Sequence, residues 1–487
     1  MNYDFFAVAP ELSLVVTALV ILATDVVLRG DYKQLANPIA GIGALVALGF
    51  TLALWGEERV AFGGAFTVTP YAVVFKVVFL VALLAILGIS WRYFAEGRYF
   101  QGEYYFLLVT SFIGMLIMPS AGDLLTLFIA LETVSIPGFV MAGLRKRDLY
   151  SSEAAIKFFL IGVLSVALML FGMSMVYGFT GTTSLTGIAE AIRGGDAPVA
   201  LLLASVMLVI VGFGFKVSAV PFHFWAPDTY AGSPMPVAAM LAVASKAAGF
   251  AGLISVTFIA FEPLADTWAP ALGVLGVLTM TLGNLIALQQ RDVVRLLAYS
   301  SVAQAGYMLV PFGIAQAGNQ ALNDSAVQSV VVYLAAYAVM NIGAFGVVVA
   351  VNRRTGERSI ADYAGLGSRN ALLALGMTTF LLSLGGIPPM VGFWAKFYVF
   401  FAAVEAGTVF GYVLGGFVVI NSVIAMFYYL RLAATMWMGT AREGAPALQP
   451  GLNLSAVVGL LAVATIVLGL FVSIITDYAT VTTIAAG

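Results

Sequence analysis

Apolar runs long enough to cross a lipid bilayer dominate this sequence. A spanning helix needs about 20 mostly apolar residues, and the 487-residue chain contains about fourteen such runs. They lie near 5–28, 36–56, 70–94, 103–120, 122–143, 152–179, 198–220, 235–258, 268–289, 293–315, 326–351, 371–405, 408–438 and 453–476. Backbone polar groups in lipid must be satisfied within each run, which favours helices over strands. The sequence therefore predicts an all-α polytopic membrane protein.

Composition places lipid around most of the chain and leaves it few groups for cofactor chemistry. Hydrophobic residues make up 62% and charged residues 9%, whereas a soluble domain carries roughly 25% charged residues. There is no cysteine and only one histidine, His223, which excludes disulfides, cysteine-held iron–sulfur clusters or zinc, and multi-histidine metal or haem sites. We expect no cofactor in this chain. A net charge of −2 without a basic patch gives no sign of nucleic-acid binding.

The basic residues between the runs are distributed very unequally between the odd-numbered and the even-numbered loops. Only Arg59 and Arg193 follow even-numbered runs. Fifteen follow odd-numbered runs: Arg29, Lys33, Arg92, Arg98, Arg145, Lys146, Arg147, Arg291, Arg295, Arg353, Arg354, Arg358, Arg369, Arg431 and Arg442. Because positive residues gather in cytoplasmic loops, we expect the odd-numbered loops in the cytoplasm and both termini in the periplasm. The N-terminus lacks the basic region of a secretory signal, so the first run is expected to be a retained span.

The five remaining basic residues lie inside the runs, and all are lysine: Lys76, Lys157, Lys216, Lys246 and Lys396. Arginine stays protonated in proteins, whereas a buried lysine can lose its proton. The basic residues inside the runs are therefore all of the type that can titrate. A charge at mid-bilayer costs about 3 kcal/mol or more. We interpret Lys216, Lys246 and Lys396 as functional. For Lys76 we favour snorkelling or a neighbouring partner, and for Lys157 both interpretations stay open.

Glu132 is the one carboxylate expected near the middle of the bilayer, about 15 Å from either end of its run at the rise of a helix. Glu11, Asp25 and Glu405 lie near the ends of runs and are expected at the solvated interface. A lone buried carboxylate is neutralised unless it is paired. A nearby lysine would stabilise its charged form and would itself hold its proton more firmly, so a change in their separation would act as a switch.

Prolines fall close to several of these ionisable residues. Pro221 follows Lys216, and the segment Gly385–Pro389, with two glycines and two prolines, precedes Lys396. Proline removes a backbone donor, and discontinuous helices beside ionisable groups are typical of transporters. We expect breaks in runs 7 and 12, whereas a packing kink is a fair interpretation of Pro137 in run 5.

His223 lies just past the break expected in run 7. A single histidine is usually a structural residue. Its place after a broken helix and near Lys216 favours a role as a proton relay.

An internal repeat is visible at a spacing of about 170 residues. The segment that begins at Asp123 parallels the one at Asp292, and Phe224-Trp225 parallels Phe393-Trp394. An odd number of spans per repeat inverts its topology, so runs 4–8 and 9–13 are expected to be inverted five-helix copies. The predicted organisation is a single transmembrane domain over 1–487, with peripheral spans in 1–100, the first repeat in 103–258, the second in 268–438 and a last span in 453–476.

Two long motifs carry a resemblance to a known family. Val220-Pro221-Phe222-His223-Phe224-Trp225-Ala226-Pro227-Asp228, with Ser233-Pro234, Pro236 and Ser245-Lys246-Ala247-Ala248, resembles the proton-translocating membrane subunits of complex I, which are similar to subunits of multi-chain sodium/proton antiporters. Gly385-Gly386-Ile387-Pro388-Pro389-Met390-Val391-Gly392-Phe393-Trp394-Ala395-Lys396-Phe397-Tyr398 resembles subunit N in particular. The related subunit M carries a glutamate near the position of Lys396, and subunit L adds a lateral helix, which we do not expect here.

The resemblance covers essentially the whole chain and implies a set of roles. Glu132 and Lys216 would form a coupled pair, Lys246 a central relay and Lys396 the second-half site, while Lys157 matches the lysine of the sixth span. The chain would translocate protons as a subunit of a NADH:quinone oxidoreductase in a bacterial inner membrane, without redox chemistry of its own. Flavin, iron–sulfur clusters and quinone are expected in partner subunits, among them an M-type subunit and small membrane subunits. The alternatives are a subunit of a sodium/proton antiporter and a membrane scaffold, and a scaffold would not explain five lysines in lipid.

Overall fold

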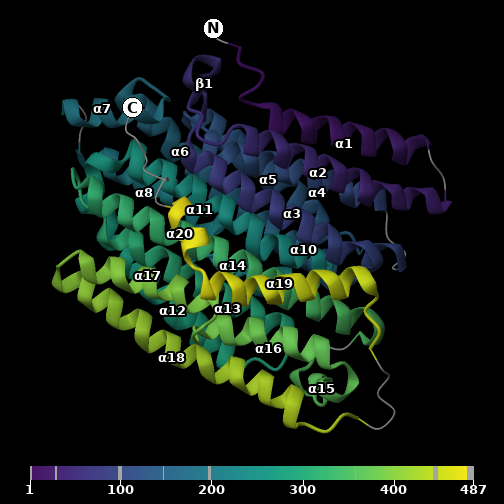
Figure 1. Ribbon diagram of the computed structural model, residues 1–487. Coiled ribbons are helices and arrows are strands. Elements are labelled where there is room, and N and C mark those ends of the chain that lie inside the picture. Colours follow the sequence, from purple (N-terminus) through teal and green to yellow (C-terminus); the bar gives the residue numbers. More distant parts are fainter. Residues whose placement is uncertain are drawn as a thin grey trace.

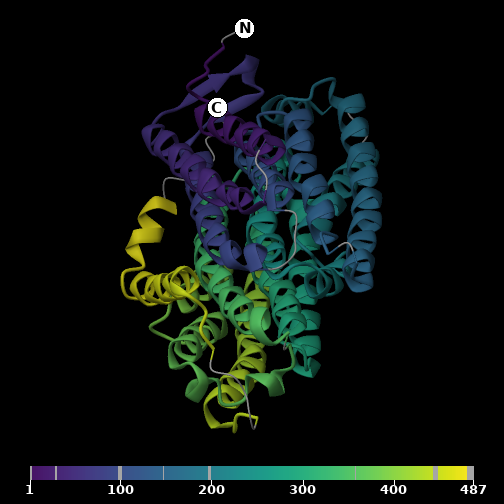
Figure 2. The same cartoon turned by 90° about the vertical axis from the view of Figure 1, so that its right-hand side faces the viewer.

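The computed structural model describes residues 3–27, 30–96, 101–145, 147–195, 199–356, 358–442 and 448–479. Within this part of the chain, twelve helices are long and apolar enough to cross a membrane, and two shorter apolar helices accompany them. In Figures 1 and 2 the helices form an elongated bundle with α1 towards one end and α18 towards the other. The prediction of a helical polytopic membrane protein is confirmed. Arg29, Arg98 and Lys146 lie outside the described residues.

The helices follow the apolar runs closely. They are α1 (Ala9–Val27), α2 (Ala36–Ala53), α3 (Pro70–Glu96), α4 (Gln101–Ile117), α5 (Leu124–Ala142), α6 (Leu149–Thr180), α7 (Leu185–Gly194), α8 (Val199–Lys216), α9 (Trp225–Gly232), α10 (Met235–Met240), α11 (Lys246–Ser255), α12 (Ala265–Gln289), α13 (Val293–Leu309), α14 (Gln320–Thr355), α15 (Leu366–Arg369), α16 (Ala371–Gly385), α17 (Val391–Glu405), α18 (Val409–Met438), α19 (Leu452–Leu470) and α20 (Ser473–Ala479). Helices α10 and α11 form one span, Met235–Ala260, that includes two π-helical turns.

Burial divides the spans into a central and a peripheral set. The span Met235–Ala260 is wholly covered by its neighbours, and α13 and α14 nearly so, whereas α1, α6, α18 and α19 leave most of their surface open. The open surface consists largely of leucine, isoleucine, valine and phenylalanine side chains. Such a surface is stable only against lipid, so the centre of the bundle is the place where a polar site can be enclosed.

The first of two helix breaks separates α8 from α9. Helix α8 ends at Lys216 and α9 begins at Trp225. Pro221 lies between them, and because proline has no N–H, the helix cannot continue its hydrogen bonds through this position. The indole of Trp225 reaches back across the break and donates to the carbonyl of Phe215 at 3.1 Å. The break expected near Pro221 is confirmed.

The second break separates α16 from α17. Helix α16 ends at Gly385, and Gly386 adopts a left-handed conformation with φ of 89°, which glycine accepts without steric cost. Pro388 and Pro389 fill the gap before α17 begins at Val391. The break expected in this segment is also confirmed, whereas α5 runs without interruption through its own proline.

Asp123 and Asp292 occupy equivalent places at the starts of α5 and α13. Each carboxylate accepts a hydrogen bond of 2.7 Å from a backbone amide of the first turn. Each residue also forms an isolated β-bridge, Asp123 with Ser184 and Asp292 with Ser359, and both serines cap the short helix that follows them. The same local structure therefore occurs twice, once near α7 and once near α15, towards opposite ends of the bundle in Figure 1.

Two short elements were not anticipated from the sequence. Strands β1 (Arg59–Ala61) and β2 (Phe66–Val68) form an antiparallel hairpin between α2 and α3. Arg59 binds Asp4 at 2.9 Å, and its guanidinium holds the pKa of that carboxyl below its usual range. The ten-residue helix α7 is the second element. Both are shorter than a membrane span, so a search for apolar runs of spanning length cannot find them.

Candidate functional site: a buried row of lysines

Lys216 is the last residue of α8, and its amine is directed at α5. The Lys216 Nζ donates to Ser135 Oγ at 2.9 Å, and the lysine is almost completely buried. Gly249 on α11 leaves room for the lysine stem, because a Cβ at this glycine would lie 2.8 Å from Lys216 Cγ. The amine is therefore held inside the bundle by a neutral hydroxyl group.

Glu132 lies on α5, one turn before Ser135, the residue that accepts the hydrogen bond from Lys216. Residues three positions apart share a helix face, so Glu132 lies on the same face of α5 as Ser135, which accepts from the Lys216 amine. No ion pair joins the two side chains among the described residues, and the Glu132 Oε1 is buried without a hydrogen-bond partner there. Glu132 and the Lys216 amine therefore lie at the same part of α5 without a direct bond between them, and their coupling stays a prediction.

Lys246 is the first residue of α11 and directly follows the π-helical turn 241–245. Such turns shift the register of the following side chains and are frequent at functional sites. The Lys246 Nζ donates to both the carbonyl oxygen and the hydroxyl of Ser301 on α13, each at 2.5 Å. The lysine is buried, and none of the described ion pairs involves it.

Lys396 lies on α17, about one turn after the second break. Its Nζ donates to the Gly385 carbonyl at 3.1 Å and lies 4.7 Å from the ring centroid of Tyr307, within the range of a cation–π contact. No described carboxylate pairs with it. All three amines therefore donate to hydroxyls or carbonyls, and none of them forms an ion pair with a described carboxylate.

Helix α13 carries a polar stripe between two of these lysines. Ser300, Ser301, Gln304 and Tyr307 lie on it, and all are buried. Ser300 Oγ and Tyr429 OH form a hydrogen bond of 2.5 Å, and Gln304 Nε2 donates to the same hydroxyl at 3.1 Å. Sequence reasoning missed these residues because it considered only charged groups. The spacing of polar residues by three or four positions within an apolar run was a signal that points to one helix face.

Lys157 lies outside this row. Its side chain is 42% exposed and forms ion pairs with Glu153 at 2.6 Å and Asp228 at 2.7 Å. Asp228 also pairs with Arg295. These charged residues line a cavity of about 420 Å³ that also includes Arg358. The cavity belongs to the side of the bundle that carries the odd-numbered loops.

His223 lies in the broken segment between α8 and α9. It is buried, and its Nδ1 has no hydrogen-bond partner within the described part of the chain. Its ring centroid lies 4.5 Å from that of Phe224. The structure places the histidine at the break, as expected, without a direct hydrogen bond from its ring to a buried lysine.

Lys76 forms a separate buried pair at the start of α3. Its Nζ lies 2.8 Å from Glu11 Oε1, and the two side chains are 0% and 6% exposed. The expectation that Glu11 lies at a solvated interface is therefore wrong. The reason is the unanticipated hairpin, whose Phe66 ring lies 4.7 Å from the Lys76 amine and which packs against the ends of the neighbouring helices.

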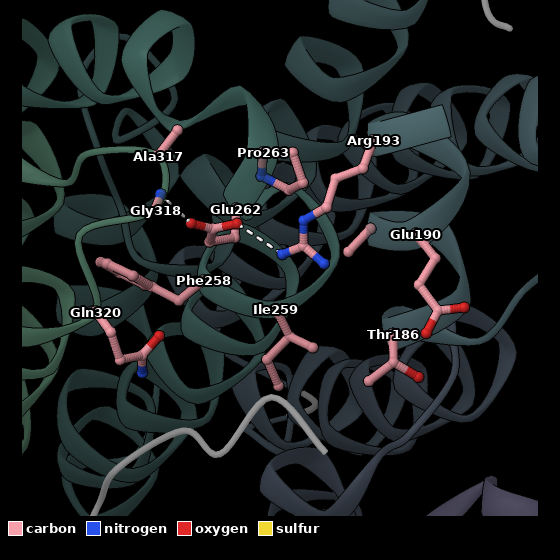
Figure 3. Close-up of a pocket in the computed structure, with 11 residues that line it drawn as sticks. Thr186, Glu190, Arg193, Phe258, Ile259, Glu262, Pro263, Ala317, Gly318 and Gln320 are labelled. Atoms are coloured by element: carbon pink, nitrogen blue, oxygen red, sulfur yellow. Dashed lines mark hydrogen bonds and ion pairs between the residues drawn. The ribbon is translucent and has the colours of Figure 1, made fainter. Parts of the chain in front are cut away.

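A second polar cavity, of about 410 Å³, is shown in Figure 3. It lies between α7 and the loop that precedes α14. Glu262 joins the two sides, because it pairs with Arg193 at 2.9 Å and accepts a hydrogen bond from the Gly318 amide at 2.6 Å. The buried lysines do not line this cavity. Within the described residues, no group of three or more histidine, aspartate and glutamate side chains could hold a metal ion.

The sequence matches a family of membrane transporters and respiratory subunits. Residues 121–425 match the family model described as NADH:quinone oxidoreductase/Mrp antiporter, TM. The chain is 43% identical to NADH-quinone oxidoreductase subunit N 2 of Streptomyces griseus subsp. griseus over 91% of its own length and 84% of the relative's. It is 40% identical to NADH-quinone oxidoreductase subunit N of Moorella thermoacetica, with 90% of each chain covered.

Solved structures show the same fold. A chain of respiratory complex I from Thermus thermophilus with bound aureothin is 31% identical, with a TM-score of 0.79 and coverage of 97% of this chain and 99% of that one. A chain of the Mrp complex from Dietzia sp. DQ12-45-1b has a TM-score of 0.81 at 18% identity, covering 98% and 95%. The second likeness is one of fold alone.

Proposed function

The chain belongs to the subunit N family of NADH-quinone oxidoreductase, the antiporter-like proton-pumping membrane subunits of complex I, and from this premise we propose that its protons move along Glu132, Lys216, Lys246 and Lys396. The observation that carries the proposal is the burial of three amines that form no ion pair with any carboxylate in the described part of the chain. A lysine held in this way can exchange its proton with hydroxyl groups or water, which an arginine cannot do. This is the property that a relay inside a membrane requires.

We further infer fourteen crossings, with the two interrupted helices counted as spans 7 and 12. Both termini then lie in the periplasm of a bacterial inner membrane, and the odd-numbered loops lie in the cytoplasm. The split of basic residues supports this orientation. The matched caps at Asp123 and Asp292, which occur at loops of opposite parity, support inverted repeats in 103–258 and 268–438. Residues 1–100 and 453–476 would lie outside the repeats.

In the proposed mechanism each repeat provides half of a proton channel, and a hydrated polar row joins the halves. A change in the separation of Glu132 and Lys216, driven from a neighbouring subunit, alters how firmly Lys216 holds its proton. Lys246 passes protons between the halves and Lys396 gates release. Moving one charge against 100 mV requires about 2.3 kcal/mol, so the coupling must supply at least that amount for each proton.

Two further residues receive roles that their positions support. His223 is proposed to relay protons at the first break, where its Nδ1 is buried and has no hydrogen-bond partner among the described residues. Lys157 is proposed to act at the cytoplasmic mouth, because its ion pairs line a polar cavity on the side of the odd-numbered loops.

Electron transfer is assigned to other chains. Flavin, iron–sulfur clusters and quinone would be held by partner subunits, since this chain has no cysteine and one histidine. An M-type subunit and small membrane subunits are the proposed neighbours. The likeness to the Mrp complex concerns the fold, whereas the relatives at about 40% identity are named as NADH-quinone oxidoreductase subunits. A sodium/proton antiporter is therefore the weaker alternative.

Replacing Lys246 or Lys396 with methionine should lower NADH-driven proton translocation by the assembled complex at least about tenfold, because a positioned proton-transfer group typically contributes about 100-fold or more. Methionine keeps an unbranched apolar stem but removes the amine. Translocation is measured with a pH-sensitive dye in proteoliposomes and normalised to the amount of assembled complex. Lys33→Met is the control, because Lys33 forms a surface pair with Asp25 at 2.9 Å. Full pumping stoichiometry in both variants would overturn the proposal.

A further inference from the structure

The second helix break leaves two adjacent carbonyl groups without their helical donors. In an α-helix the carbonyl of residue i accepts from the amide of residue i+4. The residues four positions after Leu384 and Gly385 are Pro388 and Pro389, which have no N–H. Within a membrane such carbonyls must find other donors. The break therefore creates two acceptors at the centre of the bundle.

Two side chains from different helices donate hydrogen bonds to these carbonyls. Lys396 Nζ donates to the Gly385 carbonyl at 3.1 Å, and Gln304 Nε2 donates to the Leu384 carbonyl at 3.3 Å. The proposed proton-carrying amine and a neutral carboxamide thus bind neighbouring peptide groups. The position of the Gly385 carbonyl relative to Lys396 depends on how firmly Gln304 fixes the end of α16.

Gln304 also joins tyrosines from two further helices. Its Nε2 donates to Tyr429 OH on α18 at 3.1 Å, and its Oε1 accepts from Tyr333 OH on α14. The side chain is buried, and both ends of its carboxamide are used. A side chain that satisfies several buried groups at once fixes their relative positions more strictly than a single bond would.

Through its neighbours on α13, Gln304 is also linked to Lys246, the proposed central relay. Tyr429 OH is bonded to Ser300, and the next residue, Ser301, holds the amine of Lys246. Hydroxyl groups can both donate and accept, so they can pass a proton when water completes the chain. Helix α13 therefore connects the surroundings of Lys246 with those of Lys396.

We propose that Gln304 is a positioning residue of the second proton half-channel, which holds the Leu384–Gly385 end of α16 and the hydroxyls of Tyr333 and Tyr429 in register with Lys396. This inference rests on the proposed function of the lysine row. A carboxamide suits the role because it donates to the carbonyl, accepts from a hydroxyl and adds no charge. A carboxylate of the same shape would lose the donor to Leu384 and would place a negative charge near the Lys396 amine.

The test compares Gln304→Leu with a matched control in another part of the bundle. Asn37 on α2 is also a buried amide that donates to a carbonyl, Leu87 O at 3.0 Å, and to a tyrosine hydroxyl, Tyr105 OH at 2.9 Å. Gln304→Leu is expected to lower NADH:quinone turnover and proton translocation, per assembled complex, about tenfold or more, because misplacing a reacting group by about 1 Å can cost about a hundredfold in rate. Asn37→Leu removes the same kinds of bond far from the lysines and is expected to leave the rate per complex unchanged.

Gln304→Glu keeps the side-chain shape and gives a readout that a packing role would not change. Its carboxylate would stabilise the charged form of Lys396, whose hydrogen-bond acceptor and aromatic contact, the Gly385 carbonyl and the Tyr307 ring, are both neutral. The alkaline pH at which turnover is half-maximal is therefore expected to rise relative to the wild-type complex. This variant also keeps the inference testable if Gln304→Leu fails to assemble.

The outcomes separate this inference from the proposed function. The role of Gln304 is overturned if Gln304→Leu keeps wild-type turnover, or if Asn37→Leu loses as much turnover as Gln304→Leu. The proposed function still stands in either case, provided that Lys396→Met lowers pumping. An unchanged pH profile in Gln304→Glu also counts against the role of Gln304. If Lys246→Met and Lys396→Met both pump normally, the proposed function fails, whatever the Gln304 variants do.

Discussion

Replacing Lys216 with arginine should slow proton transfer as severely as replacing it with methionine, by at least about tenfold. Arginine keeps the positive charge and begins with the same three methylene groups, which the space above Gly249 admits. Its guanidinium, however, stays protonated at physiological pH. A site that needs a fixed positive charge would accept arginine, whereas a site that must release a proton would not.

The measurement is NADH-driven acidification of proteoliposomes, with quinone reduction followed in the same sample. The amount of assembled complex corrects for variants that fold poorly. Lys33→Arg is the control, because Lys33 forms a partly exposed surface pair and is expected to accept the change without loss. If Lys216→Arg pumps at the wild-type rate while Lys216→Met does not, the role of Lys216 is electrostatic and the proposed relay is wrong.

The prediction for Lys216 depends on the type of residue at this position and on its burial, and both could be inferred from the sequence. The helix α3 was expected at 70–94 and lies at Pro70–Glu96, and the two breaks fall where proline and glycine cluster. Spans are accurately located because each must satisfy its own backbone bonds over a fixed thickness. The burial of Lys216, Lys246 and Lys396 follows from their places within those runs.

The partners of these lysines could not be predicted in the same way. Which hydroxyl or carbonyl a buried amine binds depends on how helices far apart in sequence pack together. The resemblance makes Glu132 and Lys216 a coupled pair, yet in the structure the amine binds Ser135, and the Glu132 Oε1 has no hydrogen-bond partner among the described residues. The polar stripe of α13 escaped notice because its residues carry no charge. The hairpin was missed because each strand has only three residues.

The hairpin has an energetic consequence at the Glu11–Lys76 pair. Changing Glu11 to glutamine should destabilise the N-terminal three helices by about 3–5 kcal/mol, the range measured when one partner of a buried pair is removed. The remaining Lys76 amine would be fully buried, with the Phe66 ring as its main stabilising contact. A buried ion pair replaced as a whole by apolar residues is often neutral, so the double variant Glu11→Leu/Lys76→Met should recover most of the loss.

The comparison is made by thermal unfolding of the purified complex in detergent, together with the yield of assembled complex. Asp25→Asn serves as the reference, since the partly exposed Asp25–Lys33 pair should contribute no more than about 1 kcal/mol. Glu11→Gln is expected to lower the unfolding midpoint clearly more than Asp25→Asn, and the double variant to restore it. Equal midpoints for the two single variants would mean that water reaches Lys76. The enclosure of this pair by the hairpin, and with it the explanation for an unexpectedly buried Glu11, would then be wrong.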